Sequence, residues 1–597
     1  MSKIRVMDEL LCNKIAAGEV VERIVSIVKE LVENSIDAMS DEIKIELIES
    51  GLREIKITDN GIGMDSNDAH MAFLRHATSK IYNDDDLFNI NSLGFRGEAL
   101  PSIAAVSDVE LRTCYKDNEV GTYIHIKGGK ILEEGSSDGR IGTTFKITNL
   151  FYNTPARLKH LSSSYAELSN VVDYVNKMAL SYSNIKFKLV NDGKELLNTD
   201  GSGNMLKVIK NIYGLDVTKR MIEVEGCNED YNVYGYISLP EVTRSSRNHM
   251  TTIVNGRVVK NSTLYKSINE AYSNYKEDSR YPICVLMIET DPSLLDVNIH
   301  PSKLDIKFSN FDELNNLIKN IINKGLKDKM LIPSMSFKDN NVTKKYENLT
   351  IEIDRNNVIN ESKDEYKNRV EDLVNFRNEE VNNAELGNEE EISEVKIVDD
   401  ESKKLPELYP VGLLLGTYIV CENEQGIYLI DQHAAKERIN YEKMSYVLSH
   451  PNGNTISPLV PIVIELPMNE YLVLKENIDI LDKLNIEIEE FGTSSFRVVS
   501  HPTWFISGKE EEIVRQIIDL ILTKEKNFSL EKFNDNLAKM VSCKMSIKAN
   551  TYIDKPSMES LINDLRKCKN PYNCPHGRPS IIHFSIYELE RMFKRSI

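Results

Sequence analysis

The run Ile24–Ala38, which reads IVSIVKELVENSIDA, gives the strongest single indication of how the chain begins to fold. Ile27, Val28, Leu31 and Val32 recur at the spacing of one helix face, and neither Gly nor Pro interrupts the run. The pattern therefore predicts an amphipathic helix over residues 24–38 that packs its apolar stripe against a core.

Glu30 and Asn34 lie four residues apart in this helix and so project from the same face. At that spacing the carboxylate can polarise a water while the carboxamide oxygen ligates Mg²⁺. Polar pairs four apart also line ordinary solvated helix faces. The pair alone leaves both interpretations open.

Three later segments favour a ligand site. Residues 54–58 alternate as a strand and lead into Asp59-Asn60-Gly61-Ile62-Gly63, an acid followed by glycines that let a ligand approach the backbone. Asp59 is the acceptor that an adenine amino group needs, although Asp-Asn-Gly also forms a simple turn. Residues 92–100, SLGFRGEAL, predict a glycine-bracketed loop that opens into a helix N-terminus able to hold phosphates. Residues 142–147, GTTFKI, predict a strand that begins with a small donor-bearing pair.

These four pieces, in this order, resemble the GHKL ATPases, the superfamily of gyrase B, the Hsp90 chaperones, the histidine kinases and the MutL mismatch-repair proteins. Within that superfamily, the residues of these motifs are most similar to those of the MutL family. The resemblance covers essentially the whole chain outside a central linker. It rests on residues 15–23 (IAAGEVVER), 29–38 (KELVENSIDA), 75–80 (RHATSK), 94–100 (GFRGEAL) and 149–157 (NLFYNTPAR). Neither a Walker A run nor a Gly-x-Gly-x-x-Gly run competes with it.

The resemblance implies a role for each matching residue. Glu30 is expected to be the general base that orients the attacking water, Asn34 the Mg²⁺ ligand, and Asp59 the adenine acceptor. The other ATP-binding residues that it implies are Gly61, Gly63, Thr78, Ser79, Lys80, Gly94, Phe95, Arg96, Gly97, Glu98, Ala99, Leu100, Thr143 and Lys303. Lys303 ends the run VNIHPSK and is expected to sense the γ-phosphate, whereas outside that run it would be an ordinary surface lysine. In this family ATP binding dimerises the N-terminal domains, and slow hydrolysis acts as a conformational timer.

The charge is distributed unevenly along the 597 residues. The chain has 73 Lys and Arg against 92 Asp and Glu, a net charge of −19, so any contact with DNA must be local. Residues 338–404 alone carry 19 acidic and 11 basic side chains, a balance of −8, with few aromatic residues, which predicts a flexible acidic linker.

Together with the resemblance, this linker leads us to expect a multidomain α/β and α+β protein. Its parts are a GHKL sandwich at 1–209, a ribosomal-S5-like transducer at 210–337, the linker, and a C-terminal dimerisation and endonuclease domain at 405–597 with a regulatory insertion at about 443–540.

A second set of chemically active residues follows the linker. Asp431 ends a strand, and His433 and Glu437 follow it within the next helix turns, so the three can point to one place. Cys543 lies further along, and Cys574 and His576 are two residues apart in CPHGRP. Thiolate, imidazole and carboxylate together suit Zn²⁺ or Mn²⁺. Cys574 and His576 by themselves are more typical of a structural zinc.

The run DQHAAKERINYE at 431–442 resembles the signature of MutL proteins with a latent endonuclease. That resemblance makes the six residues of the second set the ligands of Zn²⁺ and/or Mn²⁺, with Asp431 the essential acid. Two cations would support nicking of one strand of duplex DNA. The alternative is a non-cutting matchmaker that recruits other nucleases and holds only structural zinc.

The resemblance also implies the partners: a second copy of the chain, duplex DNA, a mismatch-recognition protein of the MutS type, a helicase and the sliding clamp. The clamp is in doubt, because residues 456–461 (ISPLVP) lack the Gln that leads the family's clamp-binding peptide. The chain shows no leader and no apolar run of spanning length, and its 8 cysteines have no framework spacing. We therefore expect a cytoplasmic protein with reduced thiols and no membrane contact, and the resemblance implies a bacterial protein with nucleoid-associated activity.

Overall fold

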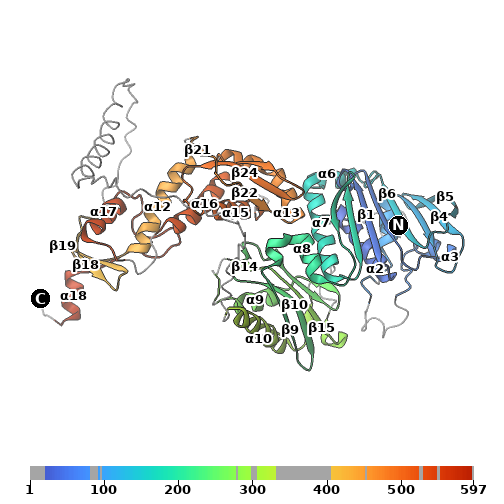
Figure 1. The fold of residues 1–597 in the computed structure, drawn as a ribbon, viewed down its shortest axis with the longest axis horizontal. Coiled ribbons are helices and arrows are strands. Elements are labelled where there is room, and N and C mark those ends of the chain that lie inside the picture. The colour runs from blue at the N-terminus through green and yellow to red at the C-terminus, as the bar shows by residue number, and fades with distance from the viewer. Residues whose placement is uncertain are drawn as a thin grey trace, which may run out of the picture. The chain divides into compact units, whose positions relative to one another are not determined.

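The computed structural model describes residues 20–80, 92–94, 97–273, 275–276, 280–296, 306–330, 405–450, 453–523, 529–546 and 552–594 (Figure 1). The predicted linker at 338–404 lies outside these ranges. Residues 1–332 with 408–597 form one unit and residues 333–407 the other. Within the described ranges, every helix is too short or too polar to span a bilayer.

The N-terminal part is built on an eight-stranded sheet in the order β5-β4-β3-β6-β2-β1-β7-β8. Neighbouring strands are antiparallel except β1 and β7, which run parallel. The strands are β1 (Glu42–Ile48), β2 (Glu54–Asp59), β3 (Asp108–Cys114), β4 (Gly121–Lys127), β5 (Lys130–Ser137), β6 (Gly142–Thr148), β7 (Lys186–Asn191) and β8 (Lys194–Asn198).

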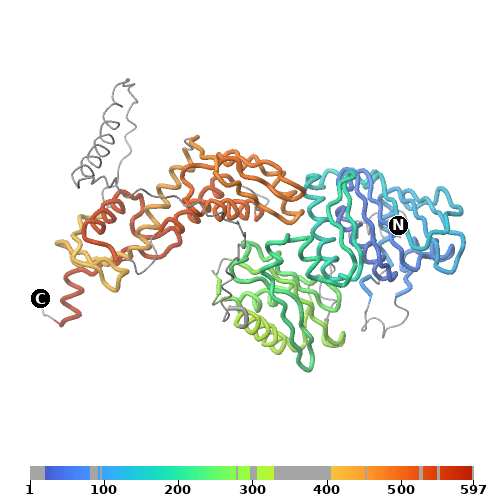
Figure 2. The backbone as a smooth tube through the Cα atoms, in the orientation of Figure 1, coloured from blue at the N-terminus to red at the C-terminus, as the bar shows by residue number. Residues whose placement is uncertain are grey.

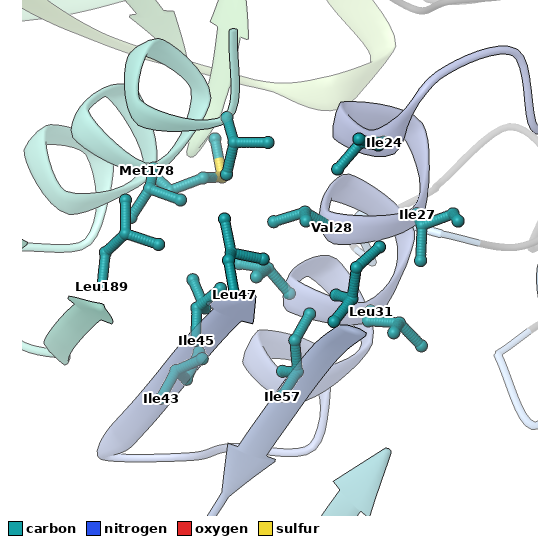
Figure 3. Packing of buried hydrophobic residues seen from close by; sticks show 14 of the residues in the cluster. Ile24, Ile27, Val28, Leu31, Ile43, Ile45, Leu47, Ile57, Met178 and Leu189 are labelled. Carbon is teal, nitrogen blue, oxygen red and sulfur yellow. The ribbon is translucent and has the colours of Figure 1, made fainter. Parts of the chain in front are cut away.

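Helices cover one face of this sheet (Figure 1). The helices of this part are α2 (Ile24–Asp37), α3 (Ser66–Met71), α5 (Ala99–Val106), α6 (Pro155–His160), α7 (Ser164–Ser181) and α8 (Met205–Thr218), with a short 3₁₀ turn at Glu49–Gly51. The predicted helix at 24–38 is thus confirmed, ending one residue earlier. Figure 3 shows Val28 and Leu31 of α2 facing Leu47 and Ile57 of the sheet. Burying each such side chain contributes about 1.5–3 kcal/mol, which fixes α2 on the sheet.

A second sheet of five strands, in the order β13-β12-β15-β10-β9, follows. Its strands are β9 (Met221–Cys227), β10 (Tyr231–Ser238), β12 (Met250–Val254), β13 (Arg257–Val259) and β15 (Cys284–Thr290), and its helices are α9 (Ser262–Ala271) and α10 (Phe311–Met330). Two short strand pairs accompany them. β11 (Thr243–Arg244) pairs with β14 (Tyr281–Pro282), and β16 (Leu295–Asp296) pairs with β17 (Lys307–Phe308). Ile212 of α8 still belongs to the first core, whereas Ile222 opens the second. Ile253 of β12 and Val285 of β15 also pack into the first core, so the second sheet contributes to both cores.

The C-terminal part holds a four-stranded antiparallel sheet in the order β18-β19-β20-β25. Its elements are β18 (Tyr409–Leu414), β19 (Tyr418–Asn423), β20 (Gly426–Asp431), β25 (Ile581–Ser585), α12 (Gln432–Ser449), α17 (Lys555–Arg566) and α18 (Ile586–Met592). Figure 2 shows its yellow start and red end running side by side, as the pairing of β20 with β25 requires.

Between α12 and α17 the chain builds a further core, which includes Phe496, Ile517 and Leu537. It contains β21 (Thr455–Ile456), β22 (Ile462–Glu465), α13 (Met468–Glu476), α14 (Ile478–Lys483), β23 (Glu487–Glu490), β24 (Ser495–Pro502), α15 (Glu510–Leu522) and α16 (Leu530–Met545). The chain thus leaves the C-terminal sheet after β20 and returns to it at β25, which makes this core an insertion.

Candidate functional site

Asp59, the last residue of β2, is a buried carboxyl with fixed partners; its exposure is 4%. Its Oδ1 accepts hydrogen bonds from the backbone N–H groups of Gly61 (3.0 Å) and Thr143 (3.2 Å), and the Ser35 hydroxyl lies 2.9 Å from its Oδ2. Burial raises the pKa of Asp59, although these hydrogen bonds and the charge of Arg140 act in the opposite direction. The carboxyl is therefore held in one orientation at the strand's end.

Two glycines follow Asp59 where the backbone leaves no room for a side chain. A Cβ at Gly61 would lie 2.6 Å from the Ser40 hydroxyl oxygen. A Cβ at Gly63, whose φ is +68°, would lie 2.0 Å from the carbonyl oxygen of Cys114. Only glycine therefore lets the turn after Asp59 pack this closely against the neighbouring chain.

The C-terminal end of α2 meets the start of the glycine-bracketed loop. The Lys80 ammonium donates to Asn34 Oδ1 (2.9 Å) and to Asp37 Oδ2 (2.5 Å). The Asp37 carboxylate also accepts from the N–H groups of Leu93 (3.0 Å) and Gly94 (3.2 Å). A Cβ at Gly94 would lie 3.4 Å from Lys80 Nζ and 3.8 Å from Asn34 Oδ1, so the loop backbone comes close to both side chains.

The far end of that loop contacts the segment before Lys80. The His76 N–H donates to the Gly97 carbonyl (3.1 Å), and a Cβ at Gly97 would lie 2.4 Å from the Ala77 carbonyl oxygen. Glu98 lies 3.6 Å from His76 and immediately precedes α5. The remaining predicted residues are placed as follows: Thr78 is half-buried and accepts from the Lys80 N–H, Ser79 is exposed, and Ala99 and Leu100 open α5. Phe95, Arg96 and Lys303 lie outside the described residues.

Glu30 is half-buried one turn before Asn34 on α2. Tyr174 of α7 packs behind this helix, and its hydroxyl lies 3.4 Å from the Lys29 carbonyl. Burial first, and then the charges of Glu33, Glu30 and Asp37, raise the pKa of Tyr174 well above its usual value. Tyr174 therefore stays neutral next to an acidic helix face.

Three residues of this site are missed by sequence reasoning: Ser35, Asp37 and Arg140. Ser35 is a polar residue at a core-facing position of α2, and such a residue can be recognised from the sequence pattern as a candidate for the site. In the structure Ser35 is 4% exposed. Asp37 follows Asn34 by three and so shares its face. Arg140 Nη2 donates to the Asp59 carbonyl (3.1 Å), and nothing in the local sequence predicts that contact.

In the C-terminal part, Glu437, Cys574 and His576 bring one ligand atom each to within 4.8 Å of one another. Glu437 is 2% and Cys574 1% exposed, whereas His576 reaches the surface. Glu437 Oε2 is buried and has no hydrogen-bond partner among the described residues, and His576 Nδ1 lies 3.5 Å from it. A buried carboxylate oxygen next to a thiol and an imidazole fits a transition-metal cation such as Zn²⁺.

The other three predicted metal ligands lie outside the group formed by Glu437, Cys574 and His576. His433 Nε2 lies 3.4 Å from Glu437 Oε1 and so adjoins the group. Asp431 is the N-cap of α12, where its Oδ1 accepts from the N–H groups of His433 (2.9 Å) and Ala434 (3.1 Å). Cys543 is exposed on α16, a helix that packs against α12. Neither Asp431 nor Cys543 belongs to the close group.

The loop that carries Cys574 and His576 is tied to α12 by two charged residues. Arg438 Nε donates to the Asn573 carbonyl (2.6 Å). The Glu442 carboxylate accepts from the backbone N–H groups of Lys569 (2.8 Å) and Asn570 (3.3 Å). Glu442, which ends the motif at 431–442, therefore positions the loop, a role that its sequence position does not reveal.

Family models match three parts of the chain. Residues 22–146 match the histidine kinase-, DNA gyrase B-, and HSP90-like ATPase, residues 209–327 the C-terminal domain of DNA mismatch repair protein, and residues 411–553 the MutL C terminal dimerisation domain. The fold and the N-terminal site thus define a GHKL-type ATPase joined to a dimerisation domain.

Similar proteins cover the chain from end to end. It is 44% identical to the DNA mismatch repair protein MutL of Anoxybacillus flavithermus, over 100% of both chains. It is 44% identical to that of Listeria monocytogenes, over 99% of this chain and 98% of the relative, and 41% identical to that of Bacillus pumilus, over 100% of both. The chain belongs to the MutL family of DNA mismatch repair proteins, as the resemblance predicts.

Proposed function

We propose that this mismatch-repair ATPase is also a metal-dependent nicking enzyme. ATP binding and slow hydrolysis in the N-terminal part drive the dimerisation of two N-terminal domains and so coordinate mismatch recognition with nicking of the strand to be repaired. The observation that carries the proposal is the convergence of Glu437, Cys574 and His576, where the buried Glu437 Oε2 has no hydrogen bond among the described residues and lies 3.5 Å from His576 Nδ1.

In the N-terminal site, Asp59 accepts from the adenine amino group beside the close-packed Gly61 and Gly63. Asn34 ligates the Mg²⁺ that accompanies the phosphates, and Glu30 orients the attacking water as general base. The half-buried position of Glu30 one turn before Asn34 supports this division of roles. We expect Glu30→Ala to bind ATP without hydrolysing it, and undiminished turnover would contradict the assignment.

In the C-terminal site, Glu437, Cys574 and His576 hold the metal, with His433 adjoining, and Asp431 and Cys543 completing the predicted set. A bound Zn²⁺ or Mn²⁺ supplies Lewis acidity and an activated water for cleavage of a phosphodiester. Glu437 and Cys574 are buried and would hold the metal from inside the protein, while the exposed His576 leaves the site open to DNA.

Nicking of supercoiled plasmid in Mn²⁺ tests the proposal. We expect the wild-type protein to convert the plasmid to the open circle, and Asp431→Asn and Glu437→Gln to lose the activity. Asp479→Asn removes an acid from the exposed surface of α14 and should leave nicking unchanged. Absence of nicking by the wild type with every metal tried would refute the enzyme.

The alternative is the non-cutting matchmaker with structural zinc. It is favoured by Asp431, whose carboxylate caps α12 and does not join the close group. In that case chelation would lower the melting temperature of the protein, and no metal would give nicking.

We propose a homodimer that acts on duplex DNA with a mismatch-recognition protein of the MutS type and a helicase, in the bacterial cytoplasm. Contact with the sliding clamp would use residues 456–461, where the Leu459 side chain is fully exposed (103%). Clamp-stimulated nicking by the wild type and by Leu459→Ala decides this. Equal stimulation would remove the segment from the proposal.

A further inference from the structure

The end of α2 carries an ion pair in the place where the nucleotide's own charges are expected. Lys80 Nζ lies 2.9 Å from Asn34 Oδ1, the oxygen assigned to Mg²⁺. The same ammonium binds the Asp37 carboxylate, whose two oxygens also accept from the Leu93 and Gly94 N–H groups. Lys80 and Asp37 are 20% and 12% exposed, so the pair is largely shielded from water.

Two consecutive backbone N–H groups of a glycine-containing loop and one lysine ammonium donate to Asp37. The phosphate sites of other proteins use the same kinds of donor. Hydrogen bonds from such donors to an ionised oxygen are strong, and a second anion can reach the same hydrogens only by displacing the first. Likewise, a cation at Asn34 Oδ1 competes with the Lys80 ammonium for that oxygen and is repelled by its positive charge.

We propose that Asp37 is a built-in competitor of the nucleotide phosphates, and that the Lys80–Asp37 pair takes the place of the magnesium–phosphate pair when no nucleotide is bound. This rests on the assignment of the N-terminal site to ATP. Phosphates release Asp37 from Leu93, Gly94 and Lys80, and the Mg²⁺ then takes the oxygen that Lys80 leaves. The empty site keeps its donors satisfied, and part of the phosphate binding energy is used to break the internal contacts.

The test compares Asp37→Asn with the wild-type full-length chain by calorimetric titration without Mg²⁺. Sodium tripolyphosphate is the probe for the phosphate donors, and adenosine the probe for the Asp59 pocket. Because the neutral amide competes less well than a carboxylate, we expect Asp37→Asn to bind tripolyphosphate roughly three- to tenfold more tightly. Adenosine affinity should not change.

Asp41→Asn is the matched control, because it removes one exposed negative charge just beyond the end of α2. It measures how much of the gain comes from net charge alone. A gain in Asp37→Asn no larger than that in Asp41→Asn, or weaker tripolyphosphate binding, would overturn the proposal. If Asp37→Asn does not fold, Asp37→Ser, which also removes the charge, supports the same comparison.

Amide hydrogen exchange gives a second readout that needs no ligand. Loss of the Asp37 carboxylate should speed exchange at Leu93 and Gly94 and leave the amides of α7 unchanged, whereas a general loss of folding would speed both. Unchanged exchange at Leu93 and Gly94 would contradict the proposal. A wild-type protein that binds neither ADP nor adenosine would instead refute the nucleotide site itself.

Discussion

The carboxyl of Asp59, which we propose binds adenine, opposes the stability of the fold that holds it. Burial raises its pKa, so the folded protein binds a proton at this carboxyl more tightly than the unfolded chain does. The charged form therefore costs stability, and the cost grows as the pH rises through the pKa range and is constant above it.

We expect Asp59→Asn to raise the stability of the nucleotide-free protein at pH 7 and to abolish ADP binding. The amide oxygen can still accept from Gly61 and Thr143, while the adenine loses its charged acceptor. Urea unfolding at several pH values should show the difference from wild type shrinking as the pH falls toward 4. A difference that grows on acidification would mean that the pKa of Asp59 is lowered, not raised, by folding.

Gly63→Ala tests the close packing of the turn that follows Asp59. Because a Cβ there would lie 2.0 Å from the Cys114 carbonyl oxygen, we expect Gly63→Ala to cost about 3 kcal/mol of unfolding free energy and to impair ADP binding. Gly193→Ala is the control: its φ of +78° is similar, but no atom lies within 4 Å of its Cβ position. That change should cost only about 1 kcal/mol.

At the scale of elements, the loop before β25 depends on α12 for its position. We expect Glu442→Gln to weaken zinc binding about tenfold, because the neutral amide holds the Lys569 and Asn570 N–H groups less firmly and the loop with Cys574 and His576 loosens. Competition of the purified protein with a chromogenic chelator measures the affinity. Asp479→Asn should bind zinc like wild type, and an unchanged affinity in Glu442→Gln would show that the loop holds itself.

The elements also show what sequence can predict. Helix α2 is predictable to within one residue because its apolar spacing and uninterrupted run are local properties. The meeting of Glu437 with Cys574 and His576 can be inferred only through family resemblance, since it depends on β20 pairing with β25 across a whole inserted core. The Lys80–Asp37 pair escapes prediction, because the two residues lie far apart in the sequence and no local pattern marks either one as the partner of the other.

At the scale of the whole molecule, we expect the C-terminal sheet to form the dimer interface. Register places Leu414 beside Tyr418, Val420 beside Leu429, and Leu429 beside Ile582, so one face of the sheet carries apolar side chains across its four strands. We call it the outer sheet face; Leu414, Tyr418 and Ile582 on it are 47%, 40% and 51% exposed. An apolar sheet face open to water is typical of a subunit interface, and this face lies largely in the part that matches the dimerisation domain.

Ile582→Glu should therefore separate the C-terminal dimer. The side chain is half exposed in the single chain, so a charge there is tolerated by the monomer, but in a dimer it would be buried without a partner. We expect the dissociation constant to rise about a hundredfold or more, equivalent to about 3 kcal/mol, with little change in melting temperature measured at low concentration. Sedimentation velocity over a range of concentrations measures this dissociation constant.

Leu459→Glu is the control, because it is an equally drastic change at a fully exposed site away from this sheet. It should leave the dimer intact, and equal behaviour of the two variants would exclude the outer sheet face as the interface.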